Sequence, residues 1–134
     1  MKRSLQDKYT LDDLRAILKD LRGPEGCPWD RDQNYESLKV TLRDETQEVL
    51  DAVDHKDMEN LQEELGDLLL QVLFYADLAA EDGYFTLDDV MTGLGRKLVR
   101  RHPHVFGDAK AETPEEALAL WREVKRRERE EGYR

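Results

Sequence analysis

The segment at residues 60–81, NLQEELGDLLLQVLFYADLAAE, contains the longest apolar stretch of the chain and decides the fold. Its apolar residues recur every three or four positions, the spacing of one face of an α-helix. That face comprises Leu61, Leu65, Leu68, Leu69, Val72, Tyr75, Ala76 and Ala79, with Leu70, Leu73 and Phe74 elsewhere around the helix. Because a helix that is apolar nearly all round is normally buried, we predict a central helix that opens at Asp57.

The residues near the N-terminus predict a helix followed by a constrained loop. Thr10 and Asp13 form a capping-box pattern at the start of this helix, which should stop at Gly23-Pro24. Residues 23–30, GPEGCPWD, then hold two glycines and two prolines and carry one large aromatic side chain, Trp29. Trp29 is interpreted either as buried packing or as a lid over a ligand.

Helical spacing predicts three further helices. One runs from about Tyr35 to Asp54, and another is capped at Thr86 and stopped by Pro103. The last is capped at Thr113, and its charged end at residues 125–131 is expected to be solvated. No window alternates with the period of two that marks a half-buried strand, so we predict an all-α fold built as a helical bundle.

Length, charge and cysteine content narrow the class of protein. The chain has 134 residues, and we expect residues 1–134 to form a single domain. Acidic residues number 31 against 21 Lys and Arg, giving a formal net charge of −10, which argues against a general nucleic-acid binder. No secretory signal or bilayer-spanning segment is recognised, so a cytoplasmic protein without a membrane partner is expected. Cys27 is the only cysteine, which excludes an internal disulfide.

Two of the predicted helices carry pairs of acidic residues on faces that should pack. With about 100° per residue, Glu45 falls within the apolar stripe of its helix and Glu48 at the border of that stripe. Glu64 and Asp67 occupy apolar arcs of the central helix. Buried carboxylates are costly unless they pair with cations, and an all-oxygen set favours Mg²⁺ or Mn²⁺. Ion pairs at the rim of the bundle are the alternative interpretation.

Cationic residues occupy similar positions on the helix that precedes Pro103. Arg101 falls within its apolar stripe, Lys97 lies at the border, and Arg100 points further outward. Lys and Arg side chains are well suited to phosphate oxygens. These residues therefore either neutralise the carboxylates as structural ion pairs or, together with metal, clamp a polyphosphate.

These motifs resemble those of the MazG family of nucleoside triphosphate pyrophosphohydrolases, an all-α group. The resemblance runs from the first helix to about Arg127. It rests on the segments Leu21-Arg22-Gly23-Pro24 with Cys27-Pro28-Trp29-Asp30, Glu63 to Leu69, and Lys97-Leu98 with Arg100 to Phe106. The metal pattern of the family, Glu-Glu-x-x-Glu followed by Glu-x-x-Asp, is matched by Asp44-Glu45-Thr46-Gln47-Glu48 and Glu64-Leu65-Gly66-Asp67. Asp44 stands where the family usually has its first Glu, which is not one of the family's metal ligands.

The resemblance implies a Mg²⁺-dependent hydrolase that cuts a nucleoside triphosphate between the α and β phosphorus atoms, with Mn²⁺ as a substitute metal. It implies a role in cleaning the nucleotide pool. It also implies metal ligation and catalysis by Glu45, Glu48, Glu64 and Asp67, phosphate binding by Lys97, Arg100 and Arg101, and a place for Trp29 beside the base or sugar.

Other interpretations stay open at this point. The same fold and metals could serve a pyrophosphatase selective for dUTP or for a phosphoribosyl nucleotide. A protein of another class, a non-catalytic helical binding or regulatory module, would use the acidic residues in ion pairs. The central helix has more apolar surface than one small bundle covers, with Leu70, Leu73 and Phe74 available for a neighbouring subunit, so we expect a homodimer or a higher homo-oligomer.

Overall fold

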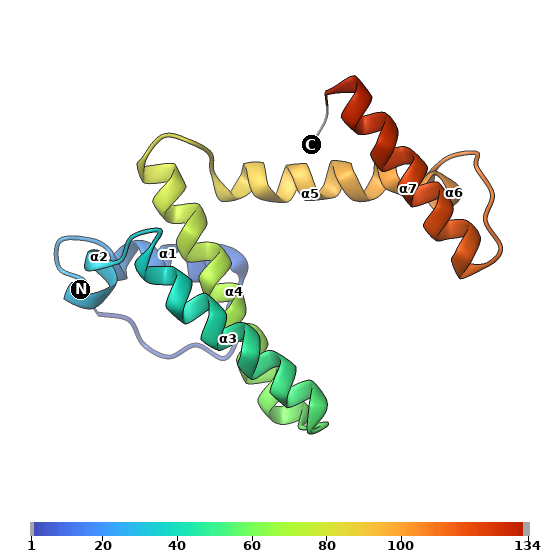
Figure 1. The fold of residues 1–134 in the computed structure, drawn as a ribbon. Helices are drawn as coiled ribbons and strands as arrows, with labels where there is room; N and C mark the ends of the chain where they lie inside the picture. The colour runs from blue at the N-terminus through green and yellow to red at the C-terminus, as the bar shows by residue number, and fades with distance from the viewer. Residues whose placement is uncertain (1, 133–134) are drawn as a thin grey trace. The chain divides into compact units, whose positions relative to one another are not determined.

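A computed structural model describes residues 2–132 of the chain, and it confirms the all-α prediction: these residues form seven helices and no β-strand (Figure 1). The contacts divide the chain into two compact units, one up to Leu87 and one from Asp88 onward. Each unit is described separately. None of the described helices has the length and apolar character needed to span a membrane.

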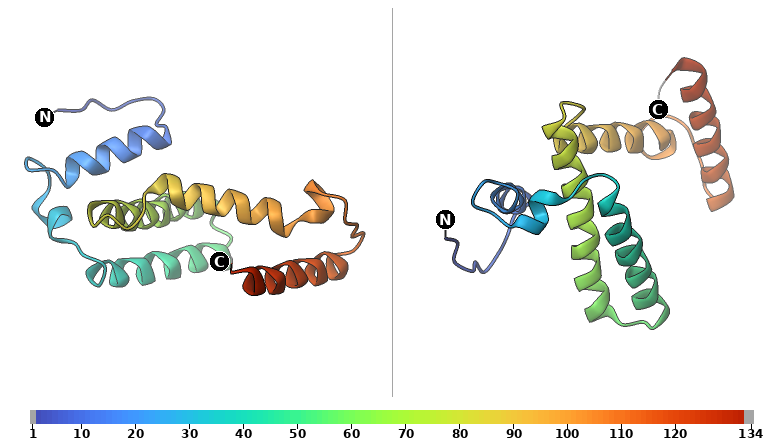
Figure 2. Two further views of the ribbon diagram at one scale, coloured as in Figure 1. Left: turned by 90° about the horizontal axis from the view of Figure 1, so that it is seen from above. Right: turned by 60° about the vertical axis from the view of Figure 1, so that its left-hand side comes forward.

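A helical hairpin forms the centre of the first unit. Its arms, α3 (Ser37–Asp54) and α4 (Met58–Glu81), run antiparallel and side by side (Figures 1 and 2). The turn between them contains Lys56, whose φ of 54° lies in the left-handed region. Asp57 caps α4 as predicted, because its side chain accepts a hydrogen bond from the backbone N–H of Asn60 at 3.2 Å.

Helix α1 (Leu11–Leu21) packs against this hairpin and completes the core of the unit. The predicted capping box is confirmed: the Thr10 hydroxyl accepts from the N–H of Asp13, and the Asp13 carboxylate accepts from the N–H of Thr10. The core is apolar and is built from α1, α3, α4 and Leu87. It consists of Leu18, Leu38, Leu73, Phe74, Ala76, Leu78 and Leu87.

The prediction of a fully buried central helix is wrong for one side of α4. Leu70 is 41% exposed and Leu65 is 48% exposed, because α3 and α1 cover only part of the helix circumference. Leu73 and Phe74 are 5% and 2% exposed within the core. The expectation that these two side chains pack on a neighbouring subunit is therefore also wrong, whereas Leu70 stays accessible.

The loop after α1 differs in part from its prediction. Pro28 begins a short helix, α2 (Pro28–Asp32), because proline is well tolerated in the first helical turn. Before it, Gly26 passes so close to the end of α1 that a Cβ atom there would lie 2.1 Å from the carbonyl oxygen of Leu21. The N–H of Cys27 donates to the same oxygen at 2.7 Å. Only glycine fits this approach, so the loop is fastened to α1 at this point.

The second unit contains α5 (Leu87–Arg101), α6 (Pro103–Phe106) and α7 (Pro114–Glu131), of which α5 begins at the last residue of the first unit. Pro103 ends α5 as predicted, and it also begins the short helix α6, which was not predicted. The predicted cap at Thr113 is confirmed by its hydrogen bond from the N–H of Glu116 at 3.2 Å. The charged end of α7 is not wholly solvated, since Glu128 is only 3% exposed.

Gly26→Ala should destabilise the protein by about 1–3 kcal/mol, the usual range for overpacking a closed site. The cause is the backbone of α1, which has no room for the added methyl group. Urea denaturation of the two proteins measures the difference. Gly93→Ala is the control: Gly93 lies inside α5 with open space around it, so alanine should stabilise by up to about 1 kcal/mol. Equal stability of Gly26→Ala and the wild type would contradict the close approach.

Candidate metal centre

Three of the four predicted carboxylates meet across the hairpin. Glu45 and Glu48 on α3 and Glu64 on α4 each place one carboxylate oxygen within 4.8 Å of the others, and we call this group the carboxylate cluster. Glu45 and Glu64 are half-buried and Glu48 is exposed. The i, i+3 spacing on α3 puts Glu45 and Glu48 on neighbouring parts of one face, and the antiparallel pairing of the helices brings Glu64 to them.

Asp67, the fourth predicted ligand, is not within this group of oxygens. It is half-buried one helical turn beyond Glu64. Its charge nevertheless acts on the cluster: burial is the main cause that raises the pKa of Glu45, and repulsion from Asp67 and Glu48 adds to it. Asp67 therefore belongs to the electrostatic surroundings of the three glutamates.

The cluster lacks partners for part of its charge. Oε2 of Glu45 and Oε2 of Glu64 are buried and accept no hydrogen bond from any described residue. Hydrogen bonds with Glu48 and Glu45, followed by burial and the charges of both, raise the pKa of Glu64 to about 8. Without a cation the cluster thus retains a proton at neutral pH, because three adjacent carboxylates repel one another when all are ionised.

These residues fit a hard divalent cation. All the available donor atoms are carboxylate oxygens, the ligands that Mg²⁺ and Mn²⁺ prefer. The two orphaned oxygens lie on different helices, so a cation between them would satisfy both and would tie α3 to α4. The alternative of ion pairs is not realised, because none of the three glutamates forms a salt bridge with a described residue.

A polar contact that we did not predict lies next to the cluster. Gln71 is 6% exposed, and its Oε1 accepts a hydrogen bond from the Thr41 hydroxyl at 2.9 Å. Thr41 is one turn before Glu45 on α3, and Gln71 is one turn after Asp67 on α4. A buried hydrogen bond between two helices opposes sliding of one along the other. The sequence feature that could have indicated this contact is Gln71 itself, a polar residue within an otherwise apolar run.

The predicted phosphate-binding residues lie in the second unit. Arg100 and Arg101 both form ion pairs with Glu128 of α7, at 2.7 Å and 3.1 Å. The Arg100 side chain is 31% exposed and that of Arg101 is 13% exposed, which agrees with the more outward direction expected for Arg100. Lys97 is half-buried and has no ion pair with a described residue.

Two neighbours of Arg101 were also missed. The Arg101 guanidinium lies 5.5 Å from the ring centre of Trp121, and the Lys125 ammonium lies 4.9 Å from it. Both distances fit cation–π contacts. The i, i+4 spacing of Trp121 and Lys125 on α7 could have indicated their proximity to each other, but their proximity to Arg101 depends on how α5 and α7 pack.

Trp29 lies on α2 and is 56% exposed, so the interpretation as buried packing is wrong. The segment around it is held by Arg22, which donates a hydrogen bond to the backbone oxygen of Asp30. The same guanidinium binds Glu81 of α4 through two hydrogen bonds of 3.1 Å and 2.9 Å, and it lies 5.2 Å from the ring centre of Phe74. Arg22 thus joins α1, α2 and α4.

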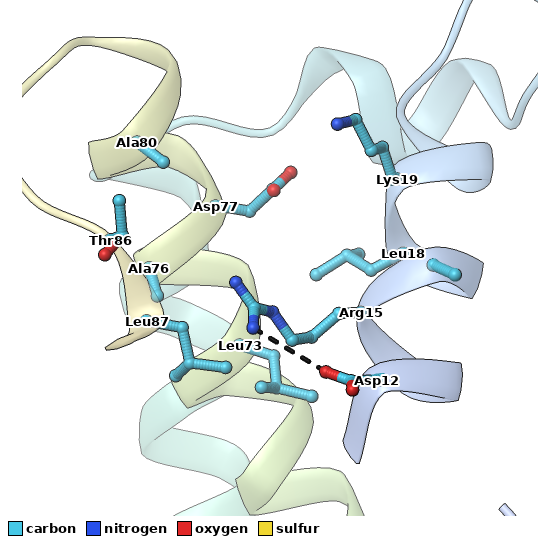
Figure 3. Close-up of a pocket in the computed structure, with 11 residues that line it drawn as sticks. Asp12, Arg15, Leu18, Lys19, Leu73, Ala76, Asp77, Ala80, Thr86 and Leu87 are labelled. Carbon is cyan, nitrogen blue, oxygen red and sulfur yellow. Dashed lines mark ion pairs between the residues drawn. The ribbon is translucent and has the colours of Figure 1, made fainter. Parts of the chain in front are cut away.

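A pocket of about 380 Å³ lies between α1 and α4, away from the carboxylate cluster (Figure 3). Its charged lining residues are two bases, Arg15 and Lys19 of α1, and two acids, Asp12 of α1 and Asp77 of α4. None of the predicted site residues lines this pocket. Its mixture of basic and acidic groups gives no excess of positive charge for a phosphate.

Fold and site together define an all-α protein with a cluster of three glutamates on an antiparallel helical hairpin. Residues 33–106 match the MazG nucleotide pyrophosphohydrolase domain. Because this match covers more than half of the chain, the chain belongs to the MazG family. The resemblance inferred from the motifs is thereby confirmed.

Individual relatives agree with this assignment. The chain is 49% identical to YabN of Bacillus subtilis over 116 residues, which is 87% of this chain and 24% of that protein. It is 48% identical over 120 residues to a nucleoside triphosphate pyrophosphohydrolase of Escherichia coli K12, covering 89% of this chain and 46% of the relative. The chain therefore spans less than half the length of these curated relatives.

A solved structure confirms the fold. The crystal structure of a MazG-related protein from Thermotoga maritima matches with a TM-score of 0.71 and 32% sequence identity. The match covers 87% of this chain and 99% of that chain.

The raised pKa of Glu64 predicts a pH-dependent stability in metal-free protein. The folded carboxyl titrates at about 8 and the unfolded one at about 4.5, so between these values the folded state binds more protons. The free energy of unfolding should therefore fall as the pH rises from about 4.5 to 8. Thermal melting in EDTA measures this for wild type and for Glu64→Gln, in which residue 64 cannot ionise.

The stability of the wild type relative to Glu64→Gln should decrease over this pH range. A difference that is flat or rises would contradict the protonated cluster. Added Mg²⁺ should remove most of the decrease in the wild type, because the cation replaces the proton as the partner of the carboxylates. Glu64→Gln should respond less to Mg²⁺.

Proposed function

We propose that this chain hydrolyses a nucleoside triphosphate to the nucleoside monophosphate and pyrophosphate in a reaction that depends on Mg²⁺. The observation that carries the proposal is the carboxylate cluster with its two orphaned oxygens, in a chain of the MazG family. The Escherichia coli relative is named a nucleoside triphosphate pyrophosphohydrolase. We propose that residues 1–134 act as a single functional domain in the cytoplasm, in the removal of unwanted nucleotides.

The carboxylates would hold the cation. Glu45, Glu48 and Glu64 would bind Mg²⁺ or Mn²⁺ directly, and Asp67 would join them as the fourth acidic ligand. Bound there, the cation would supply neutralisation of phosphate charge and activation of water. The hairpin supports this role because the Thr41–Gln71 hydrogen bond and the buried core fix the two helices that present the ligands.

Side chains of the protein would orient the attacking water and bind the substrate. A carboxylate of the set would orient the attacking water as a general base, since it is ionised once a cation neutralises its neighbours. Lys97, Arg100 and Arg101 would bind the β and γ phosphates and stabilise the negative charge of the departing pyrophosphate. The exposed position of Trp29 supports a contact with the base or sugar.

Glu64→Gln and Asp67→Asn should each lower kcat at least about 100-fold, because loss of a ligand should exceed the 10–100-fold effect typical of a ligand's supporting contacts. An assay with Mg²⁺ and a panel of ribo-, deoxyribo- and oxidised nucleoside triphosphates, which resolves pyrophosphate from orthophosphate, measures this. Asp51→Asn, an equal change at an exposed position of α3, is the control and should retain activity. Full activity of Asp67→Asn would show that the assigned metal site is wrong.

The same panel tests the alternatives. A rate confined to dUTP, or to an added phosphoribosyl nucleotide, would replace the broad substrate class by that narrower one. Orthophosphate as the only phosphate product would contradict cleavage between the α and β phosphorus atoms. No product from any substrate would favour the non-catalytic helical module.

We also propose that the chain forms a homodimer or a higher homo-oligomer. Leu69 and Leu70 of α4 are 42% and 41% exposed, and with Leu14, Ile17 and Leu21 of α1 they line an apolar groove. A patch of this kind on a small protein is typical of an interface. Light scattering should give a mass of at least twice 15.7 kDa, and Leu70→Lys should lower it. A single species of 15.7 kDa would reject the oligomer.

A further inference from the structure

The second unit contains one fully buried residue among those described, and that residue is charged. Glu128 of α7 is 3% exposed, whereas every described apolar side chain of the unit is at least partly accessible. A buried carboxylate destabilises a fold unless cations and hydrogen bonds compensate for its lost hydration. The packing of this unit therefore depends on what Glu128 binds.

Two adjacent guanidinium groups of α5 bind it. Nε of Arg100 donates to Oε1 of Glu128 at 2.7 Å. Arg101 approaches side-on: its Nε lies 3.3 Å and 3.2 Å from the two oxygens, and its Nη2 lies 3.1 Å from Oε2. The hydrogen bonds from Arg100 and then Arg101 lower the pKa of Glu128, so the ion pairs persist at neutral pH.

This arrangement fixes Arg101 from two directions. Glu128 occupies the Nε edge of the guanidinium group, and the ring of Trp121 lies 5.5 Å from its central carbon. A guanidinium group has five N–H donors, so the N–H groups of Nη1 are not used by Glu128. The Lys125 ammonium lies 4.9 Å from the centre of the same Trp121 ring, so a second cation is near Arg101.

We propose that Glu128 is a positioning residue for phosphate binding: it holds Arg101 so that the Nη1 N–H groups of this guanidinium face the β and γ phosphates. The inference rests on the proposed function. A long Arg side chain that is already ordered loses less conformational entropy when an anion binds. A merely structural ion pair would stabilise the unit without affecting phosphate affinity.

Glu128→Gln tests the proposal because it keeps the shape of the side chain and removes its charge. We expect the KM for the best nucleoside triphosphate of the panel to rise about tenfold, the effect of one charge-assisted contact, with kcat within about twofold of the wild type. Calorimetric titration with inorganic pyrophosphate and Mg²⁺ should show a similar rise in Kd. Glu128→Asp, which keeps the carboxylate, should recover part of the affinity.

Glu123→Gln is the matched control, since Glu123 lies on the same helix and pairs with Arg126 and Arg127 at exposed positions. It should leave KM and Kd unchanged. An unchanged or lower KM in Glu128→Gln, with the wild type active, would overturn the inference and show that Glu128 is structural or competes with the phosphate. Should the wild type release no pyrophosphate, the proposed function fails, and the calorimetric Kd still decides whether Glu128 positions a phosphate site.

A second measurement uses the wild type and covers the case in which Glu128→Gln does not fold. The Nε–H resonance of Arg101, assigned with Arg101→Lys, should be shifted and protected from solvent exchange by its bond to Glu128. On titration with pyrophosphate and Mg²⁺ the Nη resonances should move while the Nε–H signal stays protected. Loss of that protection would mean that the anion displaces Glu128, which would overturn the positioning role.

Discussion

The antiparallel contact between α3 and α4 is the interaction on which the first unit depends. It buries Leu38 against the core and places a hydrogen-bonded Thr41–Gln71 pair between the helices. One turn further along, the same contact brings three glutamates within 4.8 Å of one another. The apolar part of the hairpin thus holds together an acidic part that would separate by itself, because like charges repel at this distance. A divalent cation would convert that repulsion into a further link between the helices.

Buried carboxylates lack cationic partners in the first unit, whereas the buried carboxylate of the second unit is paired with two arginines. In the hairpin, Oε2 of Glu45 and Oε2 of Glu64 have no partner among the described residues, and the pKa of Glu64 rises to about 8. In the second unit, Arg100 and Arg101 neutralise Glu128, and its pKa falls. The first arrangement favours an added cation, whereas the second uses one carboxylate to hold two guanidinium groups in place.

Much of the local structure follows from short-range rules that the sequence displays. The helix starts after Thr10, Asp57 and Thr113 were predicted because a side-chain oxygen can satisfy free N–H groups of the first turn. The acidic face of α3 was predicted because helical geometry alone places Glu45 and Glu48 together. Burial was harder to predict. Leu70 and Phe74 lie one turn apart on the same helix, yet Leu70 is 41% exposed and Phe74 is 2% exposed. Phe74 is part of the core and lies beneath the Arg22 guanidinium, whereas Leu70 lines an apolar groove beside α1.

The sequence by itself therefore determined the all-α class, the family and the identity of the acidic and basic residues, because periodicity, capping and motifs act within one helix or one short segment. Only the tertiary structure decided which of these residues meet. Glu64 joins Glu45 and Glu48 while Asp67 is outside the group, and Glu128, expected in a solvated tail, is the buried partner of Arg100 and Arg101. Such contacts depend on the packing of helices far apart in the chain, and the periodicity of a single helix carries no information about its partner.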